Sequence, residues 1–233
     1  KGEVVGFSGL QGAGRTELAM SVFGKSYGND ITGSIEISGK KVHLSTPKEA
    51  IDHGMAYVTE DRKGNGLILS DSIAINTTMA RIKKICNKFG VIDIDKENNV
   101  AGEYVKKLNT KTPSVRQKLG NLSGGNQQKV LLSKWMFADS EILILDEPTR
   151  GIDVGAKYEI YCIINDLVAQ GKSVVMISSE MPELLGMCDR IYVMNNGEIV
   201  QESNAKDATQ ESIMKAILDS EKKEKADKET VAS

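Results

Sequence analysis

The stretch Gly9-Leu10-Gln11-Gly12-Ala13-Gly14-Arg15-Thr16 decides the fold class of this chain. It follows residues 4–8, whose apolar pattern predicts a strand, and a helical pattern begins near Arg15. The stretch fits the phosphate-binding pattern G-x-x-x-x-G-K-[ST], with arginine in place of lysine. Glycines let backbone N–H groups curl around a phosphate, and the positive end of the following helix faces the same point. The alternative is an ordinary strand-to-helix turn, and the other motifs decide between the two.

Arg15 is the departure from the pattern within this loop. Lysine is a compact charge on a flexible stem, whereas arginine is a longer planar fork. Arg15 can still pair with a phosphate, but it cannot sit where the ammonium would unless the loop or the nucleotide moves. We therefore expect nucleotide binding to survive here and hydrolysis to be impaired. Thr16 offers its hydroxyl to Mg²⁺.

A second motif is the apolar segment 141–145 followed by Asp146 and Glu147. One interpretation is a buried strand that happens to end in surface acids. Downstream of a phosphate-binding loop, the pattern favours a catalytic edge. Asp146 is then expected to hold Mg²⁺ through its water shell, and Glu147 to polarise the attacking water as general base.

A third motif, Leu122-Ser123-Gly124-Gly125-Asn126-Gln127-Gln128, lies between the first two. Ser123 is expected to cap a helix, and the two small residues leave its first N–H groups open to an anion. Such a motif alone would also fit a plain capped helix. Two phosphate-binding devices in one chain make sense if they serve different nucleotides across an interface.

Strand and helix patterns alternate along most of the chain. Strands are expected at 4–8, 55–58, 141–145, 173–178 and 190–194, and a small hairpin at 35–44. Residues 66–135 are instead dominated by helical patterns, which predicts an inserted helical subdomain. The expected fold is therefore α/β: a mostly parallel sheet with helices on both faces, a small antiparallel part and the helical insertion.

The composition excludes several classes of protein. The 233 residues include 30 basic and 32 acidic side chains, so the basic excess typical of a nucleic-acid binder is missing. The three cysteines have no CxxC spacing and are interpreted as free thiols. We assign residues 1–220 to one domain and 221–233, which are charged and poor in apolar residues, to a disordered tail. The start at the edge of a strand suggests a fragment of a longer protein.

Taken together, these motifs resemble the nucleotide-binding domain of ABC transporters, over nearly the whole chain to about Leu218. The similarity is closest to the C-terminal ATPase half of the ATP-binding subunits of bacterial monosaccharide importers, of the ribose, galactose, xylose and multiple-sugar systems. The segments that carry the resemblance are Gly12-Ala13-Gly14-Arg15-Thr16-Glu17, Glu60-Asp61-Arg62-Lys63, residues 122–129, residues 146–157 and Ser178-Ser179-Glu180-Met181-Pro182-Glu183.

This resemblance implies ATP and Mg²⁺ as ligands and assigns roles to individual residues. The nucleotide would contact Gly9, Gly12, Ala13, Gly14, Arg15, Thr16 and Glu17 of the loop, and Ser123, Gly124, Gly125 and Asp153 across a dimer interface. The metal would lie near Thr16, Asp146 and Glu60, and the catalytic set would be Glu147, Ser179 and Glu60.

Three of these positions depart from the family's active pattern: Arg15, described above, Glu60 and Ser179. Glu60 falls where most members have a glutamine that touches Mg²⁺ and senses the membrane subunit. Ser179 falls where most members have a histidine that contacts the γ-phosphate and the attacking water. Losing one such transition-state contact typically lowers the rate by ~10²–10³. We therefore expect a degenerate site on this chain's own loop, with Ser123 and Gly125 completing the competent site of another half.

The implied function is an ATPase domain that energises monosaccharide import. The implied partners are an N-terminal ATPase half of the same parent chain, transmembrane permease subunits and, indirectly, a periplasmic or lipid-anchored sugar-binding protein, with no nucleic acid. The implied location is the cytoplasmic face of the bacterial plasma membrane. Two alternatives stay open: a regulatory half that binds nucleotide without cleaving it, and an ABC ATPase outside transport. The segment before the first strand, which holds the adenine in the family, is expected to be missing.

Overall fold

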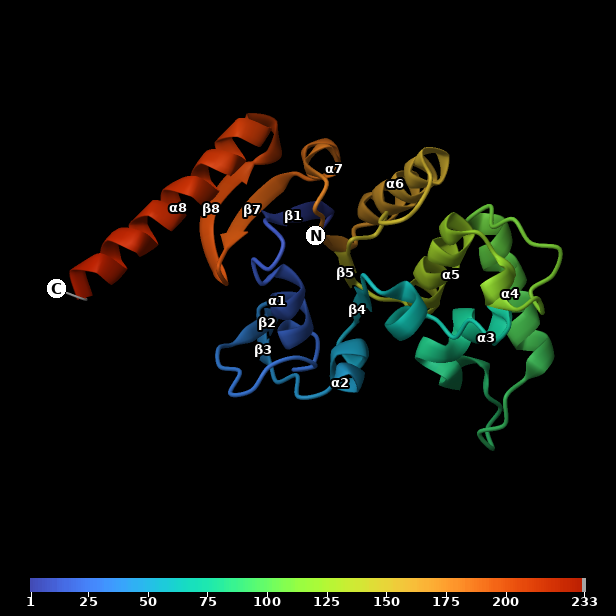
Figure 1. Cartoon of the computed structure of the whole chain (residues 1–233). Helices are drawn as coiled ribbons and strands as arrows, with labels where there is room; N and C mark the ends of the chain where they lie inside the picture. Colours follow the sequence, from blue (N-terminus) through green and yellow to red (C-terminus); the bar gives the residue numbers. More distant parts are fainter. Residues whose placement is uncertain (232–233) are drawn as a thin grey trace.

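A six-stranded sheet forms the centre of the computed structural model, which describes residues 1–231 (Figure 1). The strand order is β4-β5-β6-β1-β7-β8, and every neighbouring pair is parallel except the antiparallel pair β7 and β8. The strands are β1 (Glu3–Gly9), β4 (Met55–Val58), β5 (Ile142–Asp146), β6 (Ser173–Ile177), β7 (Arg190–Asn195) and β8 (Glu198–Asn204). The expected mostly parallel α/β sheet is confirmed.

Helices cover both faces of this sheet. Helix α1 (Arg15–Val22) lies on one face, and α6 (Val154–Ala169), α7 (Met181–Met187) and α8 (Gln210–Val231) lie on the other (Figure 1). Strand β5 lies between β4 and β6, and helices cover both faces of the sheet. Its residues are therefore apolar over nearly its whole length. This burial fixes the position of the two acids at its carboxyl end.

The expected small antiparallel part is the hairpin of β2 (Ile35–Ile37) and β3 (Lys40–Val42). Helix α2 (Pro47–Asp52) follows it and begins with a capping box: the Thr46 hydroxyl accepts from the Glu49 backbone N–H, and the Glu49 side chain accepts from that of Thr46. This helix leads directly into strand β4.

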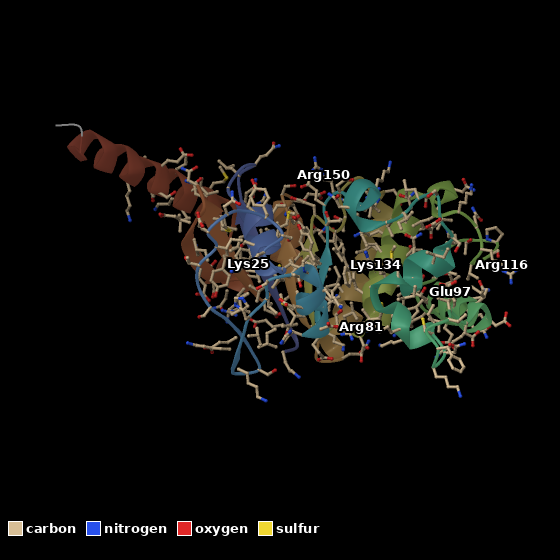
Figure 2. All side chains as sticks on the ribbon, turned by 90° about the horizontal axis from the view of Figure 1, so that it is seen from below. Lys25, Arg81, Glu97, Arg116, Lys134 and Arg150 are labelled. Carbon is tan, nitrogen blue, oxygen red and sulfur yellow. The ribbon has the colours of Figure 1, made fainter. Side chains whose placement is uncertain are left out.

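A helical layer occupies the other end of the molecule, around the interval that the sequence assigns to a subdomain. Figure 2 shows Glu97 and Lys134 within this layer and Arg116 towards its outer end. The buried Thr78 hydroxyl donates to Glu97 at 2.8 Å and so ties two of its helices together. The elements are η1 (Arg62–Gly66), α3 (Ile73–Thr78), η2 (Met79–Ile85), α4 (Ile94–Lys107), η3 (Leu119–Asn121) and α5 (Gly124–Phe137).

The structure differs from the sequence expectations at two places. Strand β8 was not predicted, although Asn196 and Gly197, at φ 49° and 83°, form the kind of turn that closes a two-residue hairpin. Helix α8 continues to Val231, into the segment expected to be disordered, because Glu, Lys and Ala are strong helix formers. Residues 232–233 of that expected tail lie outside the described residues.

Candidate functional site

The loop between β1 and α1 is shaped by two glycines that no other residue could replace without strain. At Gly9, a Cβ would lie 2.5 Å from the Met194 carbonyl oxygen of the neighbouring strand β7. At Gly14, the backbone adopts φ 93°, in the left-handed region that favours glycine. Between them, the Ala13 N–H donates to the Leu10 carbonyl at 3.0 Å and closes the turn. The loop therefore has the curled backbone that the sequence predicts.

A cleft of about 510 Å³ opens above this loop, at the carboxyl ends of the parallel strands. It brings together most of the residues that the sequence proposes for the loop, the catalytic edge and the metal, from four separate segments of the chain. The lining residues are Gln11, Gly12, Ala13, Gly14, Arg15, Thr16, Glu17, Glu60, Glu147, Arg150 and Ser179. Such a concave, polar cleft with converging charged groups is typical of a ligand site.

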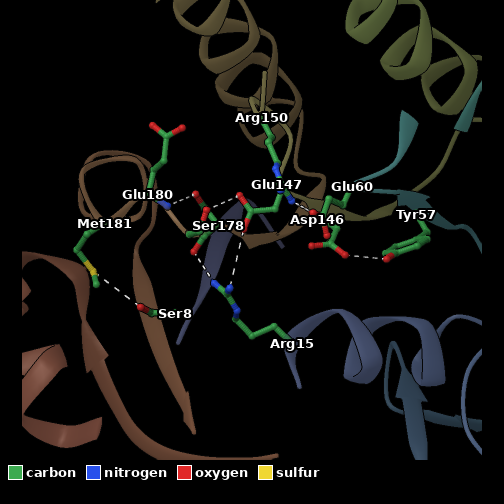
Figure 3. Close-up of polar contacts among 11 residues, drawn as sticks. Ser8, Arg15, Tyr57, Glu60, Asp146, Glu147, Arg150, Ser178, Glu180 and Met181 are labelled. Carbon is green, nitrogen blue, oxygen red and sulfur yellow. Dashed lines mark hydrogen bonds and ion pairs between the residues drawn. The ribbon is translucent and has the colours of Figure 1, made fainter. Parts of the chain in front are cut away.

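Arg15 points across the cleft towards the ends of β5 and β6 (Figure 3). Its Nη1 donates to the Ser178 carbonyl oxygen at 2.7 Å, and its Nη2 lies 3.9 Å from a Glu147 carboxylate oxygen. Both side chains are about nine-tenths buried. The charge that the loop pattern directs at a phosphate is therefore directed at the expected general base.

Glu147 is held from both sides. The Ser179 hydroxyl donates to its second carboxylate oxygen at 3.1 Å, and its own backbone sits at φ 49°, a conformation that costs a non-glycine residue roughly 1–2 kcal/mol. Burial raises the pKa of Glu147, while hydrogen bonds from Ser179 and the charge of Arg15 oppose the rise. Strained backbone of this kind clusters at functional sites, which supports a chemical role for this carboxylate.

Asp146 lies beneath the cleft and is fully buried. The Tyr57 hydroxyl donates to its Oδ2 at 2.8 Å (Figure 3), whereas its Oδ1 has no hydrogen-bond partner among the described residues. Burial raises its pKa, and hydrogen bonds from Thr16 and Tyr57 oppose the rise. A buried carboxylate oxygen without a partner, close to a threonine hydroxyl, fits a site for a divalent cation.

Within the part of the chain that the structure describes, no three His, Cys, Asp or Glu side chains gather as a ready-made metal site. A Mg²⁺ ion held by Thr16 and Asp146 would take its other oxygen ligands from phosphate groups and water, as Mg²⁺ commonly does. Glu60, also expected near the metal, forms an ion pair with Arg150 (Figure 3). That pairing offsets the negative charge that Glu60 would otherwise present to a phosphate.

The third motif lies outside this cleft: Ser123, Gly124 and Gly125 are not among its lining residues. Ser123 occupies the N-cap position of α5, as predicted. Its side chain accepts no hydrogen bond from a backbone N–H of the helix, however, so the predicted capping hydrogen bond does not form. Its hydroxyl instead accepts from the Asn126 side chain at 2.9 Å. Asp153, expected at a dimer interface, caps α6 by accepting from the Ala156 N–H at 3.0 Å.

Three residues in or beside the cleft were not predicted as site residues from the sequence. Tyr57, Arg150 and the Ser178 carbonyl all contact the expected site residues. Arg150 could have been predicted, because it follows the acidic end of β5 closely in the sequence. Tyr57 could not, because its role depends on β4 lying beside β5, with Tyr57 opposite Ile144.

The fold and the cleft define a P-loop nucleotide-binding cassette. Solved structures share that fold. They include the ADP conformation of an ATP-binding cassette of an ABC transporter (TM-score 0.70, 21% identity, 92% of this chain and 83% of that one). They also include a dimeric post-hydrolysis cassette bound to ADP and Pi (TM-score 0.73, 21% identity, 89% and 87%).

The family model described as "ABC transporter" matches residues 1–150, and the chain belongs to that family. It is 58% identical over 217 residues to the L-arabinose transport ATP-binding protein AraG of Geobacillus stearothermophilus. It is 54% identical over 213 residues to the xylose import ATP-binding protein XylG of Geobacillus kaustophilus, and 50% identical over 214 residues to the ribose import ATP-binding protein RbsA of Clostridium tetani. These matches cover 91–93% of this chain but 42% of each relative, so the chain spans less than half of their length.

Proposed function

We propose that this chain is an ATPase half that binds ATP with Mg²⁺ and helps to energise import of a monosaccharide through a membrane permease. The proposal is supported by similarity to proteins named for arabinose, xylose and ribose import. The partners would be a second ATPase half in the same parent protein, permease subunits on whose cytoplasmic side the chain docks, and an external sugar-binding protein. Within the described residues, no helix is both long and apolar enough to cross a bilayer.

The chain's own residues suit the binding of a nucleoside triphosphate. The curled backbone of residues 9–14 and the start of α1 would hold the phosphates, with Thr16 and Asp146 at the metal. Bound Mg²⁺ would neutralise charge on the phosphate oxygens. Glu147 would accept the proton of the attacking water, and its raised pKa makes it a better proton acceptor than an exposed carboxylate.

The observation that carries the finer proposal is the position of Arg15. Its contacts to the Ser178 carbonyl and to Glu147 direct the loop's cation away from the phosphate position and towards the general base. Ser179 engages the other oxygen of that carboxylate. We infer that nucleotide on this loop turns over slowly, and that Ser123 and Gly125 complete the competent site of the other half.

The same contacts favour a second candidate function. Because Arg15 and Ser179 engage both oxygens of Glu147, this half could bind nucleotide as a regulatory module without cleaving it. Both candidate functions imply slow ATP hydrolysis at this chain's own loop. They differ in whether turnover requires Ser123. An ATPase half that completes its partner's site requires Ser123 for turnover, whereas a purely regulatory half does not.

The test is ATP turnover by the full-length parent protein with its permease in liposomes. We expect Ser123→Arg to lower sugar-stimulated turnover at least 100-fold, and Glu147→Gln to lower it less than threefold. The control is Ser34→Arg, at an exposed serine beside the small hairpin, which should leave turnover unchanged. Loss of turnover with Glu147→Gln would show that this loop hydrolyses ATP. Unchanged turnover with Ser123→Arg would favour the regulatory function.

A further inference from the structure

A hairpin at residues 86–92 projects from the helical layer, between η2 and α4 (Figure 1). Cys86 and Ile92 form an antiparallel bridge at its base. Just outside that bridge, the Asp93 N–H donates to the Ile85 carbonyl at 2.9 Å, and the Ile85 side chain is fully buried. The base of the hairpin is therefore anchored in the packed layer, and its tip points away from it.

The tip itself is held in shape by one side chain. The Asn87 side-chain oxygen accepts from the backbone N–H groups of Phe89 at 2.9 Å and Val91 at 3.1 Å. Two backbone bonds reinforce this turn: Asn87 N–H to the Val91 carbonyl at 2.8 Å, and Gly90 N–H to the Asn87 carbonyl at 3.0 Å. The tip is therefore a pre-formed element and not a loose connection.

This pre-formed tip presents apolar side chains to solvent. Phe89 is 78% exposed, Val91 61% and Ile94, just beyond the hairpin, 56%; Ile82 and Ile92 are also exposed. Single exposed apolar residues are ordinary, but a cluster of five around one protrusion marks an interaction surface. Among the described residues, none of these five side chains belongs to the buried core.

The same segment is basic in a chain whose formal net charge is −2. Residues 79–92 contain Arg81, Lys83, Lys84 and Lys88 and no acidic residue. Lys88 lies over the Phe89 ring, 5.1 Å from its centroid, and Lys83 is exposed. Arg81 pairs with Asp52, and Lys84 donates to the Phe137 carbonyl, so these two cations support the base.

The acidic residues nearest to the tip belong to the following helix. Asp93 is the N-cap of α4 and accepts from the Lys96 N–H at 3.0 Å, and Asp95 lies in the first turn. Their carboxylates stabilise that helix start. The tip beyond the bridge, residues 87–91, carries the cation of Lys88 and no carboxylate.

We propose that residues 82–94 form an interfacial docking element that inserts Phe89 and Val91 into the headgroup region of an anionic lipid bilayer. Apolar side chains flanked by lysines are the combination that binds such a surface, because burial of the apolar side chains and attraction to anionic lipid act together. The lysine stems can follow the apolar boundary while their charges stay among the headgroups. A projecting tip with exposed apolar side chains (Figure 1) can enter a fluid surface without needing a groove of matching shape.

The test is sedimentation of this chain with phosphatidylglycerol vesicles and with phosphatidylcholine vesicles at low salt. We expect binding to the anionic vesicles only, weakened at least fivefold by Phe89→Ser with Val91→Ser and by Lys83→Gln with Lys88→Gln. Tyr27→Ser, at a residue that is 52% exposed in another part of the molecule, is the matched control and should bind as the unmodified chain does.

A second measurement reports insertion directly. Trp135 is buried, so Phe89→Trp adds a tryptophan whose surroundings change only if the tip is covered. Its emission should shift to shorter wavelength with phosphatidylglycerol vesicles. Absence of vesicle binding, or equal binding by the serine variant, would overturn the proposal. An emission shift that requires detergent-solubilised permease and not vesicles would also overturn it, and would assign the tip to a protein partner.

Discussion

Two neighbouring carboxylates at the end of β5 show how one residue's surroundings decide its role. Asp146 is fully buried with a hydrogen bond from Tyr57, whereas Glu147 reaches the cleft and contacts Arg15 and Ser179. Burial raises the pKa of both side chains. The native protein therefore keeps two carboxylates where their ionised form is unfavourable, which is expected of a site that trades stability for binding or chemistry.

Replacing Asp146 by asparagine should stabilise the protein at neutral pH. Because burial raises its pKa, the folded state holds the Asp146 proton to a higher pH than the unfolded chain does. Its favourable contribution is present below the unfolded pKa and is lost as the pH rises through the folded pKa. We expect Asp146→Asn to raise the free energy of unfolding at pH 7 by about 1.4 kcal/mol for each unit of that shift.

The measurement is urea denaturation at several pH values, in EDTA and without nucleotide. The gain from Asp146→Asn should shrink as the pH falls and should vanish below about pH 4, the unfolded pKa of an aspartate. Asp30→Asn, at an exposed carboxylate, is the control and should change little. A destabilised Asp146→Asn protein at pH 7 would show that the hydrogen bond from Tyr57 outweighs the burial of the charge.

At the scale of elements, the sequence predicted those whose pattern is local. The loop 9–16, the acidic end of β5 and the capping box of α2 each depend on a few adjacent residues, and the structure has all three. The roles of Tyr57 and Arg15 depend on strands that meet only in the folded sheet. The direction of the Arg15 side chain could not be predicted either, because the Ser178 carbonyl that accepts from it lies 163 positions away.

The start of α5 is packed so closely on α6 that one added methyl group should lower the stability of the protein. A Cβ at Gly125 would lie 2.5 Å from the Ala156 Cβ, well inside a normal contact. Forced overpacking of this kind costs roughly 1–3 kcal/mol. Because alanine is otherwise the better helix former, the net loss of stability in Gly125→Ala should be about 1–2 kcal/mol.

The matched control is Gly102→Ala in the interior of α4, where an added Cβ has nothing within 4 Å. It should stabilise the protein by up to about 1 kcal/mol. Urea denaturation of both variants, and of Gly125→Ala combined with Ala156→Gly, measures the difference. If both alanine variants gain stability, the contact between α5 and α6 is looser than the structure shows.

At the scale of the whole molecule, the two motifs that are predicted to bind anions lie apart. The cleft is built around the loop 9–16, and Ser123, Gly124 and Gly125 do not line it. If both motifs bind phosphate as we propose, each would supply one part of a different composite site. This separation is the structural argument for a second ATPase half in the proposed assembly, and it could be anticipated from the sequence because both motifs are local.

The last part of α8 should be dispensable for folding. Its first half is anchored by Ile213 and Ile217, which are fully buried, and by Ser220, whose hydroxyl accepts from the Asn195 side chain at 2.8 Å. Beyond that point the helix runs past the sheet (Figure 1). Deleting residues 221–233 should therefore change the free energy of unfolding by no more than about 0.5 kcal/mol. Ile217→Ala, which empties a packed position, should lower it by about 2–4 kcal/mol. Thermal and urea unfolding, followed by circular dichroism, separate the two effects. A deletion as damaging as Ile217→Ala would mean that the end of α8 contributes to the packed core.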